Sequence, residues 1–366
     1  MASGKPKVVI DARMVGEVPH GIARYVLLAA QGMENLRTAD LASFPFEPWY
    51  LVDSQINPSP QAVGLPNDRS IPVESTFLEK TELLKIPRIL RTHQASLYWS
   101  PSFSSLLPGF LGSPYPWVVT VHDLNHLHFG SRAQKIYYEW VLKPFCLSAR
   151  KVLTVSEFSK QELMAWLKLP ADRIDVVYNA MDPKLFKKGV SVLAEKPSEP
   201  PYFLCLGNPK PHKNIESLLA AYQELRKRRL DQGKPCWDLV ISGMSRKSED
   251  GVRFLAKIPE QELSTWIQGA QAMVFPSLYE GFGLPPVEAA SLGVPVIASD
   301  IPPHREGLQN AQSTILWFDP KNAASLTASL EQVFVLGKKR SAPVNLFPVE
   351  DLARSMVRIL AEALGA

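Results

Sequence analysis

The chain has few cysteines, no long apolar run and little net charge, and each shortage excludes a class of protein. Its three cysteines, Cys146, Cys205 and Cys236, are odd in number and far apart, so free thiols are expected rather than disulfides or a cysteine metal site. No uninterrupted apolar stretch approaches the ~18 residues that a membrane-spanning helix requires. A net charge of +4 over 366 residues gives no indication of a nucleic-acid partner.

Three further features are missing. Neither half carries G-x-G-x-x-G after its first strand, so the dinucleotide-binding fingerprint is absent. The chain has no internal repeat beyond its two similar halves. Residues 1–7 lead directly into a predicted strand, which predicts the absence of a signal peptide and a cytoplasmic protein. What remains is 46% hydrophobic and 21% charged residues, a composition typical of globular chains with room for two domains of about 150 residues each.

Short β-rich runs alternate with amphipathic stretches along both halves of the chain. Strands are expected at residues 8–12, 49–52, 118–121, 152–155, 174–178, 202–206, 238–242, 252–255, 273–275 and 294–298. Helices are expected at residues 22–35, from 157 after an N-cap at Ser156, at 214–227, at 260–269 and at 348–364. Residues 183–201 lose this periodicity and are interpreted as a linker. The alternation predicts two Rossmann-like domains at residues 1–183 and 201–345, with a terminal helix in residues 346–366.

The most informative segment is the glycine-rich corner at residues 279–290. A predicted buried strand leads into it and a short helix leaves it, so it lies where doubly wound sheets bind their ligands. Gly281 and Gly283 permit a tight turn and close approach of a phosphate to the backbone. Glu280 is expected at the corner and Glu288 in or near the first helical turn. The structural alternative is that these carboxylates only offset the helix dipole.

The string PSLYEGFGLPPVEAASLGVPVIASD, residues 276–300, resembles the Glu, seven residues, Glu signature of the family 4 retaining glycosyltransferases. The resemblance implies a GT-B fold: two Rossmann-like domains facing across a cleft, with a terminal helix crossing back to the first domain. It also implies metal-independent chemistry. Glu280 would lie beside the transferred sugar and Glu288 on the ribose hydroxyls. The backbone at Phe282, Gly283 and Leu284 would meet the donor phosphates.

A second segment supports the resemblance. Gly207 ends a predicted strand, and a basic turn then leads into a helix at residue 214. The turn resembles the family's diphosphate grip, and Lys213 matches the lysine that binds the donor phosphates. Many relatives carry an arginine directly after the glycine, where this chain has Asn208; Lys210 and His212 are the candidate substitutes. The alternative interpretation is an ordinary charged surface loop.

The first half contributes two weaker candidates. His122 follows a predicted strand, and in the resembled family a histidine at this position contacts the donor sugar, although a lone histidine is more often structural. His126 and His128 follow without a third ligand at matching spacing, so no metal site is predicted. Gly21 lies in a segment that resembles the family's amino-terminal glycine loop, with an ordinary strand-to-helix loop as the alternative.

The predicted function is a retaining hexosyltransferase that uses a nucleoside-diphosphate sugar and no other cofactor. Glu280, His122 and Lys213 are the predicted catalytic residues. The segments at residues 11–13, 21–25 and 211–214 most resemble the mannosyltransferase-like branch, which implies GDP-mannose first and a UDP-sugar second. Two alternatives remain open: a synthase or phosphorylase that uses a sugar phosphate, and a non-catalytic carbohydrate- or nucleotide-binding protein.

The acceptor is left open between a glycan, a lipid-linked molecule and a small metabolite. Aromatic and basic residues at 132–151, including Tyr137, Tyr138 and Trp140, would suit a lipid-linked acceptor and contact with the inner face of the membrane. Packing of this helix into the core is the preferred interpretation of the same residues.

Overall fold

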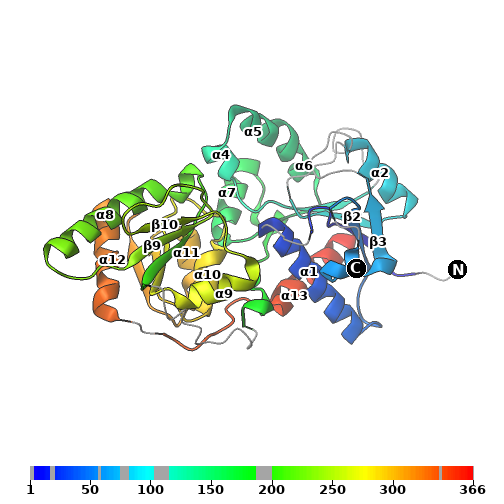
Figure 1. The fold of residues 1–366 in the computed structure, drawn as a ribbon. Helices are drawn as coiled ribbons and strands as arrows, with labels where there is room; N and C mark the ends of the chain where they lie inside the picture. Colours follow the sequence, from blue (N-terminus) through cyan, green and yellow to red (C-terminus); the bar gives the residue numbers. More distant parts are fainter. Residues whose placement is uncertain are drawn as a thin grey trace. The chain divides into compact units, whose positions relative to one another are not determined.

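The computed structural model describes residues 4–16, 21–56, 59–74, 82–102, 115–186, 200–337 and 340–365. The chain divides into two compact units (Figure 1). The first comprises Met1–Ala180 and Phe347–Ala366, and the second comprises Met181–Leu346. Of the predicted linker, the short 3-10 helix η5 (Pro183–Phe186) is described, whereas residues 187–199 lie outside the described residues.

The first unit is built on a seven-stranded sheet with the strand order β3-β2-β1-β4-β5-β6-β7. All six strand pairings in this sheet are parallel within the described residues. Its strands are β1 (Lys7–Asp11), β2 (Glu47–Asp53), β3 (Ser70–Val73), β4 (Leu97–Ser100), β5 (Trp117–Thr120), β6 (Lys151–Thr154) and β7 (Ile174–Val176). β4 and β5 are buried at all four positions, as expected for parallel strands that helices cover on both faces.

The helices of this unit that the sequence predicts have observed bounds close to the predicted ones. They are α1 (Gly21–Ala39), α2 (Glu82–Thr92), α4 (Asn125–Phe129), α5 (Arg132–Tyr137), the π-helix η3 (Tyr138–Leu142), α6 (Lys143–Ser148), α7 (Glu157–Leu167) and α13 (Val349–Leu364). Ser156 caps α7 as predicted, because its hydroxyl accepts the backbone N–H of Ser159 at 3.0 Å. The terminal helix α13 packs along α1 within the same unit (Figure 1).

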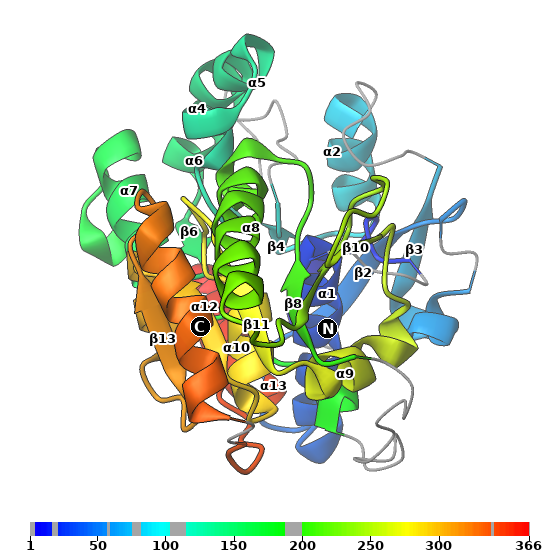
Figure 2. The ribbon, with the colours of Figure 1, turned by 60° about the vertical axis from the view of Figure 1, so that its left-hand side comes forward.

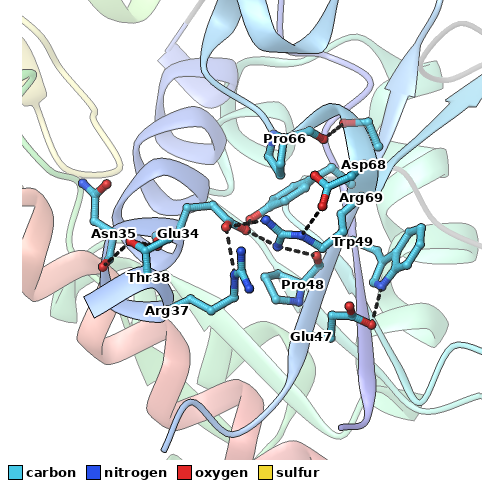
Figure 3. A network of polar contacts seen from close by, with 12 residues as sticks. Glu34, Asn35, Arg37, Thr38, Glu47, Pro48, Trp49, Pro66, Asp68 and Arg69 are labelled. Atoms are coloured by element: carbon cyan, nitrogen blue, oxygen red, sulfur yellow. Dashed lines mark hydrogen bonds and ion pairs between the residues drawn. The ribbon is translucent and has the colours of Figure 1, made fainter. Parts of the chain in front are cut away.

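A buried polar network joins α1 to the edge of this sheet (Figure 3). The guanidinium of Arg69 donates to both carboxylate oxygens of Glu34, at 2.6 and 2.7 Å, and Arg37 and Tyr50 donate to the same carboxylate. Burial opposes ionisation of Glu34, but these donors outweigh it and hold the pKa of Glu34 below its ordinary value. Charge-assisted pairing of this kind fixes the helix on the sheet.

The second unit contains a six-stranded sheet with the order β10-β9-β8-β11-β12-β13, whose neighbouring strands also pair in parallel. Its strands are β8 (Tyr202–Leu206), β9 (Asp238–Ser242), β10 (Val252–Leu255), β11 (Ala272–Phe275), β12 (Val296–Ser299) and β13 (Ile315–Phe318). Numbered in chain order they run 3-2-1-4-5-6, the Rossmann order. The prediction of Rossmann-like α/β architecture is therefore confirmed in both sheets.

Helices cover both faces of this second sheet. They are α8 (Ile215–Asp231), α9 (Glu260–Gly269), α10 (Leu284–Ser291), α11 (Pro302–Leu308) and α12 (Ala323–Leu336), with the 3-10 turn η6 (Pro211–Lys213) ahead of α8. α8 and α12 lie side by side (Figures 1 and 2). Their buried side chains join those of β8 and β9 in one apolar core that includes Phe203, Leu218, Ile241 and Leu330. This core holds the carboxyl ends of the strands in place beneath the loops that follow them.

Candidate functional site

The candidate site lies where the strand order of the second sheet reverses. β8 and β11 are hydrogen-bonded neighbours. After β8 the chain continues to β9 toward one edge of the sheet, and after β11 it continues to β12 toward the other edge. The loops that follow these two strands therefore separate at the carboxyl ends of the strands. These are the two segments that the sequence predicts as the basic turn and the glycine-rich corner. A backbone hydrogen bond joins them, because the N–H of Leu278 donates to the carbonyl of His212 at 2.7 Å.

Lys213 and Glu280 form an ion pair at this position. The Nζ of Lys213 lies 2.7 Å from Oε1 of Glu280, and the side chains are 21% and 17% exposed. The hydroxyl of Ser277 donates to the same oxygen at 2.6 Å. An ammonium carries three N–H donors, so the contact with Glu280 leaves two for an anionic ligand. The two residues predicted as catalytic in this half are therefore brought together.

The electrostatics of the pair keep Glu280 ionised. Burial favours the neutral acid, but the charge of Lys213, the field of His304 and the hydrogen bonds from Lys213 and Ser277 hold the pKa of Glu280 below its ordinary value. At neutral pH Glu280 is therefore a carboxylate that accepts hydrogen bonds. It is not an acid that supplies a proton.

The corner ends in a glycine that its surroundings require. Gly283 caps α10 with φ at 83°, and a Cβ there would lie 2.8 Å from Cδ2 of His304. Because Pro285 and Pro286 have no N–H, the backbone donors at this helix end are those of Gly283 and Leu284. Both lie at the positive end of the helix dipole, which favours an anion.

Glu288 lies deeper than the sequence indicates. It is the fifth residue of α10, past the first turn, and is 3% exposed. The prediction that placed it in or near the first turn is close, because the helix begins at Leu284 and Glu288 lies one residue past that turn. Phe282 is also buried, at 2%, so a ligand at the corner would meet its backbone rather than its ring.

The sequence analysis missed His304, which α11 carries to the back of the corner. Its Nδ1 lies 3.0 Å from the carbonyl oxygen of Ser299, the last residue of β12. The hydroxyl of Ser299 donates to the carbonyl of Ser277 at 2.6 Å. Burial lowers the pKa of His304 against the opposing charge of Glu280, so the ring is neutral at neutral pH. A histidine six residues past a predicted strand end is a weak signal in the sequence alone.

The other predicted residues of the basic turn shape the loop. A Cβ on Gly207 would lie 2.8 Å from Cδ1 of Ile215, so glycine is needed for close packing. Asn208 makes a local turn in which its Oδ1 accepts the N–H of Lys210 at 3.2 Å. Lys210 is exposed, whereas His212 is buried. Lys213 is thus the cation of this loop that the structure pairs with Glu280.

The predicted residues of the first unit have separate surroundings. Nε2 of His122 lies 2.9 Å from the carbonyl oxygen of Pro101, which can only accept, and the ring packs edge-on against Tyr25. Gly21 begins α1, and a Cβ there would meet no atom within 4 Å, so packing does not require glycine at this position. Residues 17–20 of the predicted glycine loop lie outside the described residues. Ligand contacts of His122 and Gly21 stay predictions.

Within the described ranges, no group of three or more His, Cys, Asp or Glu side chains is placed to hold a metal ion. His128, weighed as a metal ligand from the sequence, pairs instead with Glu162 at 2.7 Å. The three cysteines are free thiols, as predicted. None of the helices in the part of the chain that the structure describes is both long enough and apolar enough to span a bilayer.

The preference for core packing at residues 132–151 is wrong for one side of this helical segment. Tyr138 is buried, at 2%, but Trp140 is 76% exposed. Ile136 and Leu147 are also exposed, at 51% and 42%. α5, η3 and α6 follow one another without a break, so Tyr138 faces the core while Trp140, two residues later, faces away from it.

Two family models together match most of the chain. Glycosyltransferase Family 4 matches residues 21–185, and Glycosyl transferases group 1 matches residues 193–345. The two glutamates, Lys213 and the glycine-rich corner fall within the second match, and His122 falls within the first.

Several curated relatives are named as mannosyltransferases. The chain is 31% identical over 221 residues to the O-antigen chain mannosyltransferase RfbU of Salmonella typhimurium, covering 59% of this chain and 61% of the relative. It is 31% identical over 260 residues to the O-antigen chain mannosyltransferase B of Escherichia coli, covering 66% of each. A GDP-mannose:cellobiosyl-diphosphopolyprenol alpha-mannosyltransferase of Xanthomonas campestris is 28% identical over 226 residues, with 57% and 56% covered. The matched part thus spans less than two thirds of each relative.

Solved structures share the fold across nearly the whole chain. The sucrose-phosphate synthase (tll1590) of Thermosynechococcus elongatus superposes with a TM-score of 0.70 at 20% identity, covering 99% of both chains. Anabaena Alr3699/HepE, solved in complex with UDP and glucose, gives 0.69 at 15% identity, covering 98% of this chain and 99% of that one. Together with the two parallel sheets, these neighbours confirm the GT-B fold class that the sequence predicts.

Proposed function

Because the chain belongs to the family 4 and group 1 glycosyltransferases, we propose that it transfers mannose from GDP-mannose to an acceptor hydroxyl, with retention and without a metal ion. The observation that carries the proposal is the Lys213–Glu280 pair, at 2.7 Å, beside the point where the strand order of the second sheet reverses. A cation and a carboxylate there match two adjoining parts of a nucleotide sugar, its diphosphate and its hexose.

Departure of the diphosphate is the step that needs most help, because negative charge develops on it. Lys213 offers two free N–H donors, and the N–H groups of Gly283 and Leu284 lie at a helix end worth about half a unit charge. Preorganised donors of this kind stabilise the transition state without reorganising. In this proposal they replace a bound cation.

Glu280 faces the sugar in the proposed complex. As an ionised carboxylate it accepts hydrogen bonds from the hexose hydroxyls and stabilises positive charge as the ring becomes oxocarbenium-like. Glu280 is already engaged by Lys213 and Ser277, so we assign it no covalent bond to the sugar. The acceptor hydroxyl attacks the sugar from the face that the diphosphate leaves. This internal return accounts for retention of the anomeric configuration. Glu288 binds the ribose hydroxyls, and His122 contacts the sugar.

The donor assignment rests on the relatives. The relatives described above are named as mannosyltransferases, and the one from Xanthomonas campestris is named for GDP-mannose. A UDP-sugar is the second candidate and would use the same pair of residues. The difference between the two donors lies in the base, which the Lys213–Glu280 pair does not contact.

The acceptor is proposed to be lipid-linked and presented at the cytoplasmic face of a membrane. The exposed side chains of Ile136, Trp140 and Leu147 lie on one continuous helical segment, and Arg132 and Lys135 are exposed eight and five residues before Trp140. An apolar face with an aromatic residue and adjacent cations suits the surface of an anionic bilayer. The Xanthomonas relative is named for a diphosphopolyprenol acceptor.

The catalytic proposal is tested with Lys213→Ala and Glu280→Ala. We expect each to lower turnover of GDP-mannose with a polyprenyl-diphosphate sugar by roughly 10²–10³-fold, the cost of removing one transition-state contact. Lys234→Ala and Glu224→Ala remove exposed charges of the same unit and are the matched controls. Wild-type turnover in both site variants would reject the assignment. Binding of GDP without transfer from any nucleotide sugar would favour a non-catalytic protein.

The acceptor surface is tested separately by sedimentation with vesicles containing phosphatidylglycerol. Ile136→Glu combined with Trp140→Glu is expected to abolish binding, whereas Val335→Glu should leave it unchanged. Val335 is 84% exposed but lies on α12 of the second unit, so it controls for loss of surface apolarity alone. Equal vesicle binding by all three proteins would refute the membrane contact. Turnover with a water-soluble acceptor should be the same in all three.

A further inference from the structure

We propose that His304 is a positioning residue for Glu280, acting in its neutral form through Ser299 and Ser277. The inference rests on the proposed function, since it concerns the carboxylate that faces the sugar. It adds a residue that lies outside both segments that carry the resemblance to the family. His304 is 1% exposed, so it has no direct path to a ligand and must act through its neighbours.

The hydrogen bonds determine which nitrogen of His304 carries the proton. The carbonyl of Ser277 can only accept, so the single hydroxyl proton of Ser299 is donated to it at 2.6 Å. Ser299 therefore has only oxygen lone pairs to offer His304. Nδ1 lies 3.0 Å from the carbonyl of Ser299 and 3.2 Å from its hydroxyl. Nδ1 is consequently the protonated donor, and the neutral ring has its lone pair at Nε2.

These contacts form a continuous path from His304 to Glu280. His304 holds Ser299, and the hydroxyl of Ser299 holds the backbone of Ser277. The hydroxyl of Ser277 in turn donates to Oε1 of Glu280 at 2.6 Å, the oxygen that also accepts from Lys213 at 2.7 Å. The path ties together the segments that follow β11 and β12. Loss of the first bond frees Ser299 and, through it, the donor that orients the carboxylate.

The other edge of the ring supports the corner. A Cβ on Gly283 would lie 2.8 Å from Cδ2 and 3.2 Å from Nε2 of His304, so the ring lies directly behind this residue. Nε2 is buried and has no hydrogen-bond partner among the residues that the structure describes. A proton there would create a buried cation without an acceptor, in the field of Lys213. The neutral ring is thus the form that keeps Glu280 and the corner in place.

The test uses two substitutions that separate the role of Nδ1 from the volume of the ring. His304→Asn retains an N–H donor near the position of Nδ1, whereas His304→Leu fills space without a donor. Loss of one hydrogen bond in this path is expected to lower kcat on the order of 10-fold in the leucine variant. The asparagine variant should recover most of the wild-type kcat. KM for the nucleotide sugar and the thermal shift with GDP should stay within about twofold in both.

A second comparison shows whether His304 acts through Glu280. In a Glu280→Ala background, which removes the oxygen that Ser277 donates to, His304→Leu should change kcat by less than about twofold, since residues that act through one another are not additive. A further 10-fold loss in that background would overturn the proposal, as would an asparagine variant as impaired as the leucine variant while equally folded. A raised KM with unchanged kcat in His304→Leu would also overturn it, by showing that the residue binds the donor.

Failure of this inference can be told apart from failure of the proposed function. If the wild-type protein transfers no sugar, the proposed function fails, and positioning is then measured without substrate. The carboxyl titration of Glu280, followed by carbon NMR, should shift to a higher pKa in His304→Leu because the Ser277 donor is released. The shift should be smaller in His304→Asn, which loses the field of His304 but keeps a donor to Ser299. An unchanged Glu280 titration in the leucine variant would overturn the positioning role.

Discussion

At the scale of single residues, Gly283 shows how strictly the corner restricts its sequence. Its φ of 83° is unfavourable for other residues, and the ring of His304 occupies the space where a Cβ would lie. The same residue supplies a backbone donor at the end of α10. Conformation, packing and the proposed phosphate contact therefore all depend on one glycine.

We expect Gly283→Ala to lower the free energy of unfolding by about 1–3 kcal/mol, because it adds left-handed strain and displaces His304. Gly21→Ala is the control, since a Cβ there meets nothing within 4 Å, and its effect should stay within about 0.5 kcal/mol. Urea unfolding of the two variants measures the difference. Equal free energies of unfolding for the two variants would show that the corner accommodates the added Cβ without cost.

The buried histidine also predicts how stability depends on pH. The pKa of His304 is lowered from its ordinary 6.5 by burial and by Lys213, while Glu280 and the Ser299 backbone act in the opposite direction. Below pH 6.5 the unfolded chain binds a proton that the folded chain does not, so the free energy of unfolding should fall with falling pH until the folded pKa is reached. His304→Asn should flatten this slope in urea unfolding between pH 7.5 and 5.5.

Parallel pH profiles for wild type and His304→Asn would contradict this assignment. The lowered pKa of Glu280 acts in a separate window. Its stabilising contribution is present above the ordinary value of 4.5 and is lost as pH falls through the folded pKa. The contributions of His304 and Glu280 to the pH dependence of the free energy of unfolding therefore begin at different pH values.

At the scale of elements, the contact between α1 and α13 is close because one helix contributes a glycine. A Cβ on Gly32 would lie 2.7 Å from Cβ of Ala353 and 3.0 Å from Cγ1 of Val349. The helical spacing of apolar residues predicts α13 itself. Which residue of α1 it meets depends on the packing geometry, which periodicity does not specify.

Gly32→Leu is expected to destabilise the protein by about 1–3 kcal/mol or more, since the helices must separate to admit the side chain. Asn35→Leu places the same side chain on an exposed position of α1 and should change the free energy of unfolding by less than about 0.5 kcal/mol. Thermal and urea unfolding provide the comparison. Wild-type stability in Gly32→Leu would mean that α13 shifts without cost.

The strands differ in how well the sequence predicts them. β1 and β8 are predicted to within one residue, because short apolar runs bounded by polar residues are strong local signals. β3, β4 and β13 are not among the predicted strands. Each has only four residues, and β3 contains Pro72, which edge strands tolerate but which reads as a breaker in the sequence.

At the scale of the whole molecule, the proposed chemistry predicts independence from divalent metal ions. Transfer from GDP-mannose should stay within about twofold in EDTA, because Lys213 and the amides of α10 supply the positive potential. GDP should raise the unfolding temperature more than UDP does, since a ligand held by the folded state stabilises it. Loss of turnover in EDTA that Mg²⁺ restores would contradict the prediction.

The amino-acid sequence by itself determined the alternation of strands and helices, the glycine-rich corner and the basic turn, because each depends on residues adjacent in the chain. It also determined the family resemblance. The tertiary structure decided which of these segments meet. Only the strand order places β8 beside β11, so that Lys213 reaches Glu280 across 67 residues of sequence. The same packing brings His304 behind Gly283 and leaves Trp140 exposed, contacts that no local pattern encodes.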